Sequence, residues 1–202
     1  MKTAKRLLDK KKAVLAEISE RFGAEEGLKL RQAAEVRLDG ILTRYASVPK
    51  GARVHTDHFI FPSAAVYLTV REASDEKTAF AVIEDAAVKN SRDVGRRLAR
   101  WMRVPGMKDL FVRIWDPMTN RMFGEKNGFK NVFYPKKKGE YRMDVVSCPY
   151  VRYFAELGCP ELTKIFCEND ERCYGNLPGL AFLRTGTLGK GAERCDFCLR
   201  RV

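Results

Sequence analysis

The spacing of apolar residues in this chain of 202 residues changes at Pro105-Gly106. Before that point, apolar residues recur every three or four positions between Lys and Glu residues, which is typical of amphipathic helices. After it, short runs of aromatic and β-branched residues predict strands. The pattern therefore predicts an α+β protein, with a helical N-terminal half packed on a C-terminal antiparallel sheet with helices.

The first half predicts four helices, at residues 4–22, 25–45, 62–73 and 76–103. Gly23 ends the first helix, and Ser74-Asp75-Glu76 supplies a capping side chain and acidic first-turn residues for the fourth. We expect the fourth helix to turn Val94 and Trp101 inward. The chain between the second and third helices, with His55 and His58, is expected to be a loop because Pro49, Gly51 and Pro62 surround it.

The second half predicts a hairpin, with strands at 131–134 and 141–146 around a turn at 135–139. The run 110–115 fits either a strand or a short buried helix. Helical spacing returns over 149–169, with a break at 158–160, and two closing strands are expected at 180–188 and 195–202.

Composition narrows the class of protein further. Hydrophobic residues make up 45% of the chain, which is too many for a disordered protein. No apolar run is long enough for a membrane helix, and the N-terminus lacks the pattern of a signal peptide. We therefore expect a cytoplasmic protein that does not bind membranes, whose cysteines stay reduced.

The net charge of +12 is concentrated in residues 89–144, which hold 15 basic and 6 acidic residues. Five arginines there fit one stripe of a helix: Arg92, Arg96, Arg97, Arg100 and Arg103. Phosphates bind such stripes, but no known nucleic-acid-binding motif accompanies it. A solvated face or an interface between copies of the chain explains the stripe as well, so nucleic acid is not the expected partner, and a homo-oligomer stays open.

All six cysteines lie in the nearly neutral last quarter, at positions 148, 159, 167, 173, 195 and 198. The Cys195-x-x-Cys198 spacing lacks the second pair of a zinc ribbon, and alternation along a strand puts the two thiols on opposite faces. Cys159, Cys173 and Cys198 are expected to be small buried apolar residues.

Three cysteines have neighbouring residues that favour a reactive thiol. Cys148 precedes a helix that starts with proline, so the positive helix end is expected to lower its pKa. Cys167 lies three residues before Asp170, on one helical face, and Cys195 directly precedes Asp196. The two aspartates are the candidate proton-transfer groups, because both histidines fall in the expected loop.

A further candidate binding segment is Arg184-Thr185-Gly186-Thr187. Its guanidinium and hydroxyls are donors suited to an anionic ligand, and an arginine binds a carboxylate with two parallel hydrogen bonds. A solvated strand face is the alternative interpretation.

The cysteine-bearing motifs resemble the L-2-amino-thiazoline-4-carboxylic acid hydrolase family. They are Cys148-Pro149, Gly158-x-Pro160-Glu161-Leu162, Phe166-Cys167-x-x-Asp170, and Phe182-x-Arg184-Thr185-x-Thr187-Leu188-x-x-Gly191-x-x-x-Cys195-Asp196-Phe197. Upstream, Ala64-Ala65-Val66-Tyr67-Leu68 is similar to the alanine- and tyrosine-bearing helix of that family. The resemblance covers residues 55–202 and is specific over 148–197, while the first fifty residues carry no motif.

The resemblance implies hydrolysis of a small cyclic amidine, with opening of a 2-aminothiazoline-4-carboxylate-like ring to a ureido product. It implies a hydrolase-like α+β domain at 51–202, and residues 1–50 are then a helical extension that shares one compact unit with it. The tail after Cys198 and the thiols at 159, 173 and 198 depart from the family pattern, which leaves room for another substrate.

The resemblance and the chemistry together give expected roles. Cys195 is the first candidate for the nucleophile and Cys167 the second, with Asp170 and Asp196 as proton-transfer groups. Arg184 is the candidate for the substrate carboxylate. The other expected binding residues are Thr185, Thr187, Cys148, Tyr67 and His58. No cofactor is required by this chemistry, although a metal ion stays open. The alternative is a cysteine-rich zinc or iron–sulfur module without hydrolase activity.

Overall fold

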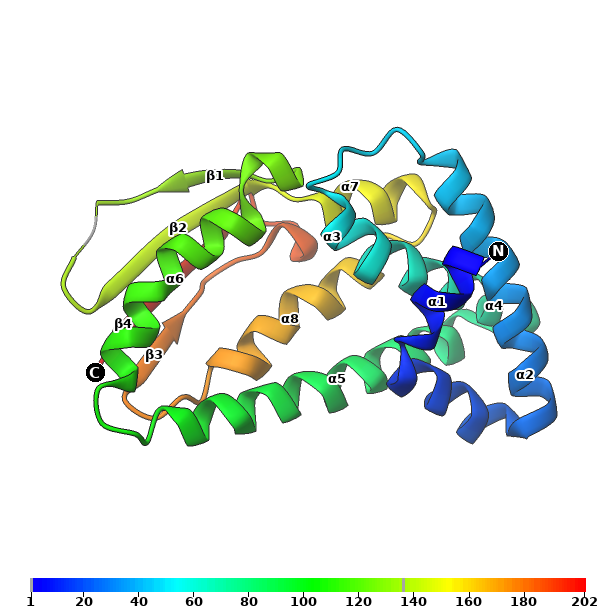
Figure 1. Ribbon diagram of the computed structural model, residues 1–202, viewed down its shortest axis with the longest axis horizontal. Coiled ribbons are helices and arrows are strands. Elements are labelled where there is room, and N and C mark those ends of the chain that lie inside the picture. Colours follow the sequence, from blue (N-terminus) through cyan, green and yellow to red (C-terminus); the bar gives the residue numbers. More distant parts are fainter. Residues whose placement is uncertain (1, 136) are drawn as a thin grey trace.

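A computed structural model describes residues 2–135 and 137–202, and it shows an elongated molecule with a helical end and a sheet end (Figure 1). The helical end contains α1 (Lys2–Asp9), α2 (Lys12–Arg44), α3 (Arg53–His55), the π-helical turn η1 (Thr56–Ile60) and α4 (Phe61–Ala73). The long helix α5 (Glu76–Trp101) runs from this end to the sheet end (Figure 1). The N-cap of α5 is Asp75, whose side chain accepts a hydrogen bond from the Thr78 N–H at 2.9 Å.

The sheet end follows α5 in the chain. Its elements are α6 (Met107–Phe123), η2 (Glu125–Asn127), β1 (Lys130–Phe133), β2 (Glu140–Ser147), α7 (Pro149–Glu156), α8 (Leu162–Tyr174), β3 (Leu180–Leu183), η3 (Leu188–Lys190) and β4 (Cys195–Arg201). The strands form one antiparallel sheet in the order β1-β2-β4-β3. The α+β architecture predicted from the sequence is therefore confirmed.

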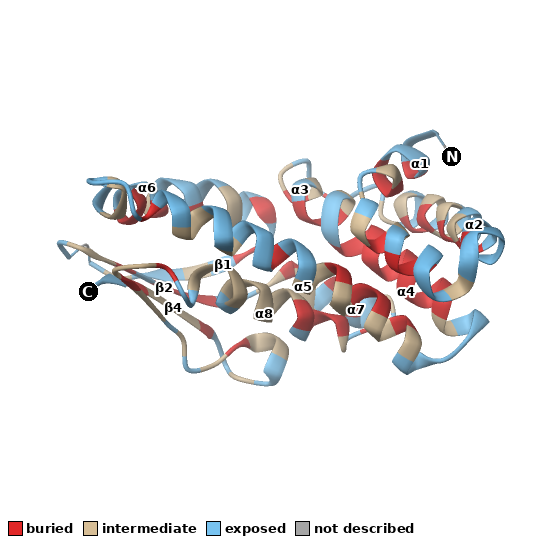
Figure 2. Cartoon of the chain, turned by 90° about the horizontal axis from the view of Figure 1, so that it is seen from below, coloured by how far each residue is buried: buried red, intermediate tan, exposed pale blue. Residues whose placement is uncertain are grey.

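The core of the helical end surrounds α4, whose residues from Phe61 to Val70 are all buried (Figure 2). Helices α2 and α5 pack on it. Leu8 of α1 and Leu38 of α2 belong to the same apolar cluster as α4, so the N-terminal helices share a core with the rest of the helical end. A helix that is apolar all round needs such cover on every side.

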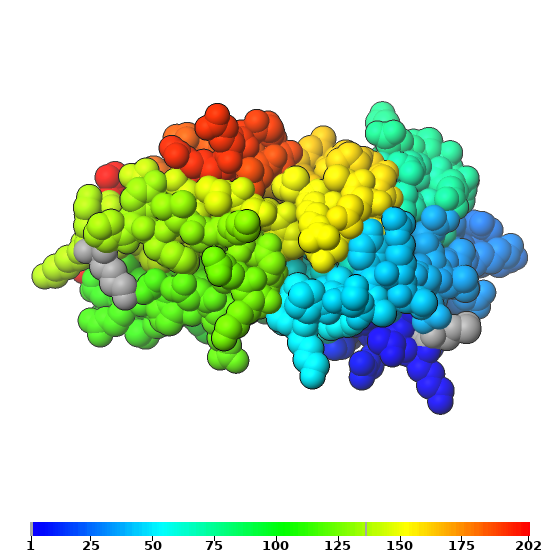
Figure 3. All heavy atoms as spheres, turned by 90° about the horizontal axis from the view of Figure 1, so that it is seen from above, coloured from blue at the N-terminus to red at the C-terminus, as the bar shows by residue number. Residues whose placement is uncertain are grey.

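A second core lies between the sheet and α6. Opposite partners in antiparallel strands share one face, and the register pairs Val145 with Cys195, Met143 with Phe197, and Tyr141 with Leu199. This face packs on Phe111 and Trp115 of α6, and all of these residues belong to one cluster. On the surface, α7 fills the space between the two ends of the molecule (yellow in Figure 3).

The structure corrects several sequence-based expectations for individual elements. Residues 110–115 belong to α6, and the expected strand 180–188 ends at Leu183. The first expected helix breaks after Asp9, whereas Gly23 forms the predicted boundary as a kink in α2 with φ of 80°. Trp101 is 61% exposed, because it is the last residue of α5 and projects beyond both cores.

The predicted hairpin between β1 and β2 is confirmed, but Lys136 in its turn lies outside the described residues. The segment 53–60, which was expected to be a loop, is helical. Within the described part of the chain, no helix is long and apolar enough to cross a membrane.

Candidate active site

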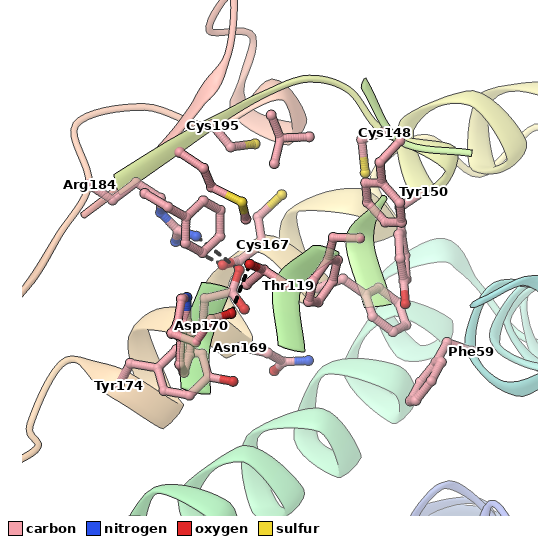
Figure 4. Close-up of a pocket in the computed structure, with 17 residues that line it drawn as sticks. Phe59, Thr119, Cys148, Tyr150, Cys167, Asn169, Asp170, Tyr174, Arg184 and Cys195 are labelled. Atoms are coloured by element: carbon pink, nitrogen blue, oxygen red, sulfur yellow. Dashed lines mark hydrogen bonds and ion pairs between the residues drawn. The ribbon is translucent and has the colours of Figure 1, made fainter. Parts of the chain in front are cut away.

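A cavity of about 230 Å³ lies between the two cores, where α8 faces the sheet (Figure 4). Residues of η1, α6, β2, α7, α8 and β4 line it. Cys148, Cys167, Asp170, Arg184 and Cys195, which the sequence placed in one site, all line this cavity.

Local structure explains how the two central thiols reach the cavity. Cys167 and Asp170 are three residues apart on α8, so one helical face presents both. Cys195 begins β4 opposite Val145, and this register turns its side chain to the inner face of the sheet. Cys195 is 7% exposed.

Cys167 has the side chain best suited to be a thiolate. The Cys195 thiol donates a hydrogen bond to it, and this bond lowers the pKa of Cys167 to about 6 against the opposing effect of burial. The Thr187 hydroxyl, the Gly189 N–H and the positive charge of Arg184 lower the pKa further. A group with this pKa is largely ionised at neutral pH.

Cys195 is the complementary partner in this pair. Its pKa is raised, first because its proton is held by Cys167 and then because the side chain is buried. The Leu188 N–H lies 3.2 Å from the Cys195 sulfur and opposes this rise. The sequence-based order, with Cys195 as the first candidate for the nucleophile, is therefore opposite to the order that these environments favour.

Gly189 lets the turn η3 approach Cys167 closely. A Cβ atom at this position would lie 2.7 Å from the Cys167 sulfur and 2.8 Å from Thr163 Cγ2. Only a residue without a side chain brings its backbone N–H to the sulfur here. The glycine was not among the candidate residues, because its role depends on a contact between segments far apart in sequence.

Asp170 and Arg184 form an ion pair at one end of the cavity (Figure 4). Burial raises the pKa of Asp170 to about 7, although the guanidinium opposes the rise. The Asp170 side chain keeps 30% exposure because it lines the cavity, whereas Arg184 keeps only 3%. Near neutral pH, Asp170 is thus able both to give and to accept a proton.

Two of the three guanidinium nitrogens of Arg184 already bind acceptors of the protein. Its Nη1 donates to Asp170 Oδ2 at 3.1 Å, and its Nη2 donates to the Cys167 carbonyl at 2.8 Å. Nη2 also lies 3.6 Å from Glu171 Oε2. The guanidinium therefore positions the backbone and carboxylate of α8, and its charge is shared with Asp170.

Asp196 lies on the other face of β4 and holds the segment after β3. It accepts hydrogen bonds from the Thr185 N–H, the Thr185 hydroxyl and the Gly186 N–H at 2.8 to 3.0 Å. Burial raises the pKa of Asp196, but these donors together bring it below its usual value. Asp196 and Thr185 do not line the cavity, so their geometry indicates a positioning role.

Cys148 lines the cavity but differs from the expectation of a lowered pKa. Burial raises its pKa to about 12 and outweighs the N–H groups of Tyr150 and Val151 at the start of α7. A helix of 8 residues offers too small a field to reverse the cost of burying a thiolate.

Tyr67 and His58 lie outside this cavity. Tyr67 is fully buried in α4, and its hydroxyl donates to Glu161. His58 is exposed on η1, next to Lys10 and Lys11. The structure thus does not bring these two predicted binding residues to the other candidates.

His55 and Tyr150 support the cavity wall, which the sequence did not reveal. The His55 Nδ1 lies 3.1 Å from the Tyr150 hydroxyl, and Nε2 lies 2.6 Å from the Met122 carbonyl. Burial lowers the pKa of His55, so the ring is neutral, with Nε2–H as donor and Nδ1 as acceptor. Asn169 also lines the cavity, and its position one residue before Asp170 was the only signal.

The geometry does not favour the alternative of a metal-binding module. Within residues 2–135 and 137–202, no group of three or more His, Cys, Asp or Glu side chains is placed to hold a metal ion. The thiols of Cys148, Cys167 and Cys195 line the cavity but do not converge on one point, as the ligands of a metal ion must.

The chain is thus an α+β protein with a cavity, lined by three thiols, between the sheet and α8. A family model described as L-2-amino-thiazoline-4-carboxylic acid hydrolase matches residues 53–199. The chain belongs to this family. No curated protein and no solved structure gives a significant match.

Proposed function

We propose that this protein hydrolyses a small cyclic amidine of the 2-aminothiazoline type by opening its ring, with Cys167 as the nucleophile. The observation that carries the proposal is the placement of Cys167, Cys195 and Asp170 in one cavity, where the Cys195 thiol donates to Cys167 and favours its thiolate form. Membership of the hydrolase family supports the type of reaction.

In the first half of the reaction, the Cys167 thiolate attacks the ring carbon between nitrogen and sulfur. Protonated Asp170 gives its proton to the ring nitrogen as the new carbon–sulfur bond forms. The bond between this carbon and the ring sulfur then breaks, and the leaving sulfur takes the proton of Cys195. The product of this step is an open thiol joined to Cys167 through a positively charged isothiourea.

In the second half, water attacks the same carbon and gives a proton to the Asp170 carboxylate. Cys167 leaves as a thiolate, and the hydroxyl proton passes to Cys195 as the ureido carbonyl forms. Each group thus returns to its starting protonation state, and the net reaction adds one water molecule. A carboxyl with a pKa of about 7 is suited to both transfers at neutral pH.

Turnover by matched cysteine variants tests this proposal. The ring-opened ureido product from 2-aminothiazoline carboxylates, hydantoins and related amidines is quantified by mass spectrometry. Cys167→Ser is expected to lower kcat/KM by about a thousandfold or more, since an alcohol at this site is not ionised. Cys173→Ser, on the same helix but outside the cavity, is the control and keeps full activity. Full activity of Cys167→Ser on the substrate found would refute the proposal.

A further inference from the structure

The cavity has two chemically different ends (Figure 4). Asp170, Arg184, Cys167 and Cys195 occupy one end, and Phe59 marks the other. Aromatic residues make up 8 of the 17 lining residues, and Met143 and Val145 add aliphatic surface. Rings therefore form about half of the lining, and Thr119, Asn169 and Tyr150 add hydrogen-bonding groups between the two ends.

The described residues that line the aromatic end include no cation for a carboxylate. Among the residues described, Arg184 is the only Lys, Arg or His that lines the cavity, and its Nη1 and Nη2 atoms already bind Asp170 and the Cys167 carbonyl. Arg184 also lies between Phe182 and Phe197, with its Cζ 5.4 and 5.6 Å from their ring centroids. Turning it toward a ligand would break the ion pair and leave Asp170 unpaired.

Lys11 is a cation next to a lining residue, Phe59, but it does not offer a partner inside the cavity. Lys11 Nζ lies 4.7 Å from the centroid of the Phe59 ring, but Lys11 does not line the cavity. Burial lowers the pKa of Lys11 to about 8, which leaves the ammonium mostly charged at neutral pH, so only its place outside the cavity lining excludes it as a partner. A carboxylate inside the cavity would thus lose water without gaining a hydrogen-bonded cation, and that loss is costly.

We propose that the substrate of this protein is a cyclic amidine that carries an aromatic or branched alkyl group, rather than a carboxylate, next to the ring nitrogen. This inference rests on the proposed function, because it places the amidine carbon at Cys167. The apolar group then lies toward Phe59, Phe123, Phe129 and Phe166, where it is removed from water and contacts aromatic rings.

A pair of ligands that share one ring tests the inference. Binding of 2-amino-4-phenyl-2-thiazoline and of 2-amino-2-thiazoline-4-carboxylate to the Cys167→Ser variant is measured by isothermal titration calorimetry, where no reaction interferes. The phenyl compound is expected to bind at least about tenfold more tightly, because its ring is buried on apolar surface. Equal or tighter binding of the carboxylate, or no binding of the phenyl compound, would overturn the inference.

A second variant tests where the apolar group lies. Phe59 is 41% exposed, so Phe59→Ala is compatible with folding, and in the Cys167→Ser background it is expected to weaken phenyl binding by about fivefold. Carboxylate binding stays unchanged. Phe133→Ala, at a residue that is 45% exposed on β1 outside the cavity, is the matched control. Equal effects of the two alanine variants would place the group elsewhere and contradict the inference.

These outcomes separate the inference from the proposed function. If the phenyl compound binds tightly but wild-type protein forms no ureido product from it, the ligand class stands and the reaction is wrong. If only the carboxylate compound is bound and hydrolysed, the reaction stands and the inferred substrate is wrong.

Discussion

Cys167 and Cys195 have the same side chain, and their surroundings alone separate their pKa values. The Cys167 sulfur accepts hydrogen bonds from the Cys195 thiol and the Gly189 N–H and lies near the positive charge of Arg184, and all three lower its pKa. The Cys195 sulfur accepts a hydrogen bond from the Leu188 N–H, which does not offset the rise in its pKa. Because the two thiols share a proton, they titrate as a pair, and a change at one is felt at the other.

This coupling predicts how the rate of Cys167 alkylation by iodoacetamide depends on pH. The rate is expected to rise with pH around a midpoint of about 6, because the thiolate is the reacting form. Cys195→Ala removes the strongest donor to the sulfur, so the midpoint moves to higher pH. Peptide mass spectrometry after timed alkylation measures both profiles. A wild-type midpoint near 9, unchanged in Cys195→Ala, would show that the pair is not coupled.

Gly189→Ala tests the close approach of η3 to the thiolate. The added methyl group would meet the Cys167 sulfur at 2.7 Å, so the turn or the thiol must move. We expect kcat/KM to fall by at least about tenfold, since misplaced reacting groups lose orientation. Gly40→Ala on α2, whose Cβ would have nothing within 4 Å, is the control and keeps full activity. Equal activity of the two variants would contradict the role of Gly189.

At the scale of elements, β4 places two neighbouring residues in different roles. Cys195 points to the cavity, while Asp196 points away and holds the segment between β3 and η3. This segment brings Thr187 and η3 to Cys167. Asp196 therefore acts on the site through backbone position.

Asp196→Asn distinguishes positioning from catalysis. The amide oxygen still accepts hydrogen bonds from Thr185 and Gly186, so this variant is expected to keep activity within about tenfold of wild type. Asp196→Ala removes the acceptor, destabilises the protein by about 1 to 3 kcal/mol and speeds hydrogen exchange of the Thr185 and Gly186 amides. Hydrogen exchange and kcat are measured for both variants. If the Asn variant is as inactive as the Ala variant, Asp196 takes part in proton transfer.

Sequence spacing predicted the relative positions of site residues that lie on the same helix. Cys167 and Asp170 share a face because helical residues three apart do so. Asp196 was expected to transfer protons beside Cys195, but neighbouring strand residues point to opposite faces, so it lies outside the cavity. The pairing of Cys167 with Cys195 was not predictable, since it depends on how α8, η3 and β4 meet in space. The buried histidine was also missed: Pro and Gly around His55 indicated a loop, but packing against Phe129 and Tyr150 holds this segment in a helical form.

The molecule has two cores, and α5 runs from the helical end to the sheet end (Figure 1). Residues packed against each core line the cavity. Tyr150 packs against both cores, Phe166 of α8 packs against the core of the helical end, and Phe59 of η1 reaches the cavity from the helical end. The site is therefore expected to depend on the N-terminal helices, although none of their residues line it.

Leu38→Ala in α2 tests this dependence. Leu38 is fully buried, so the substitution is expected to cost about 2 to 5 kcal/mol of the free energy of unfolding. Because the cores share α5, we expect one thermal transition with a lower Tm. The transition should be the same when it is followed by far-UV circular dichroism and by the loss of ligand binding at the cavity. Leu28→Ala, at a residue of the same helix that is 54% exposed, is the control. Two separate transitions, with the cavity end unaffected, would show that the ends fold independently.

The identity of the nucleophile is tested most directly by trapping the intermediate. Wild-type protein is mixed with less than one equivalent of a cyclic amidine substrate, quenched with acid during the first turnover, and mapped by peptide mass spectrometry. The account predicts an adduct with the mass of the intact substrate on Cys167, which decays as the ureido product forms. An adduct on Cys195, or product formation with no cysteine adduct at any quench time, would contradict it.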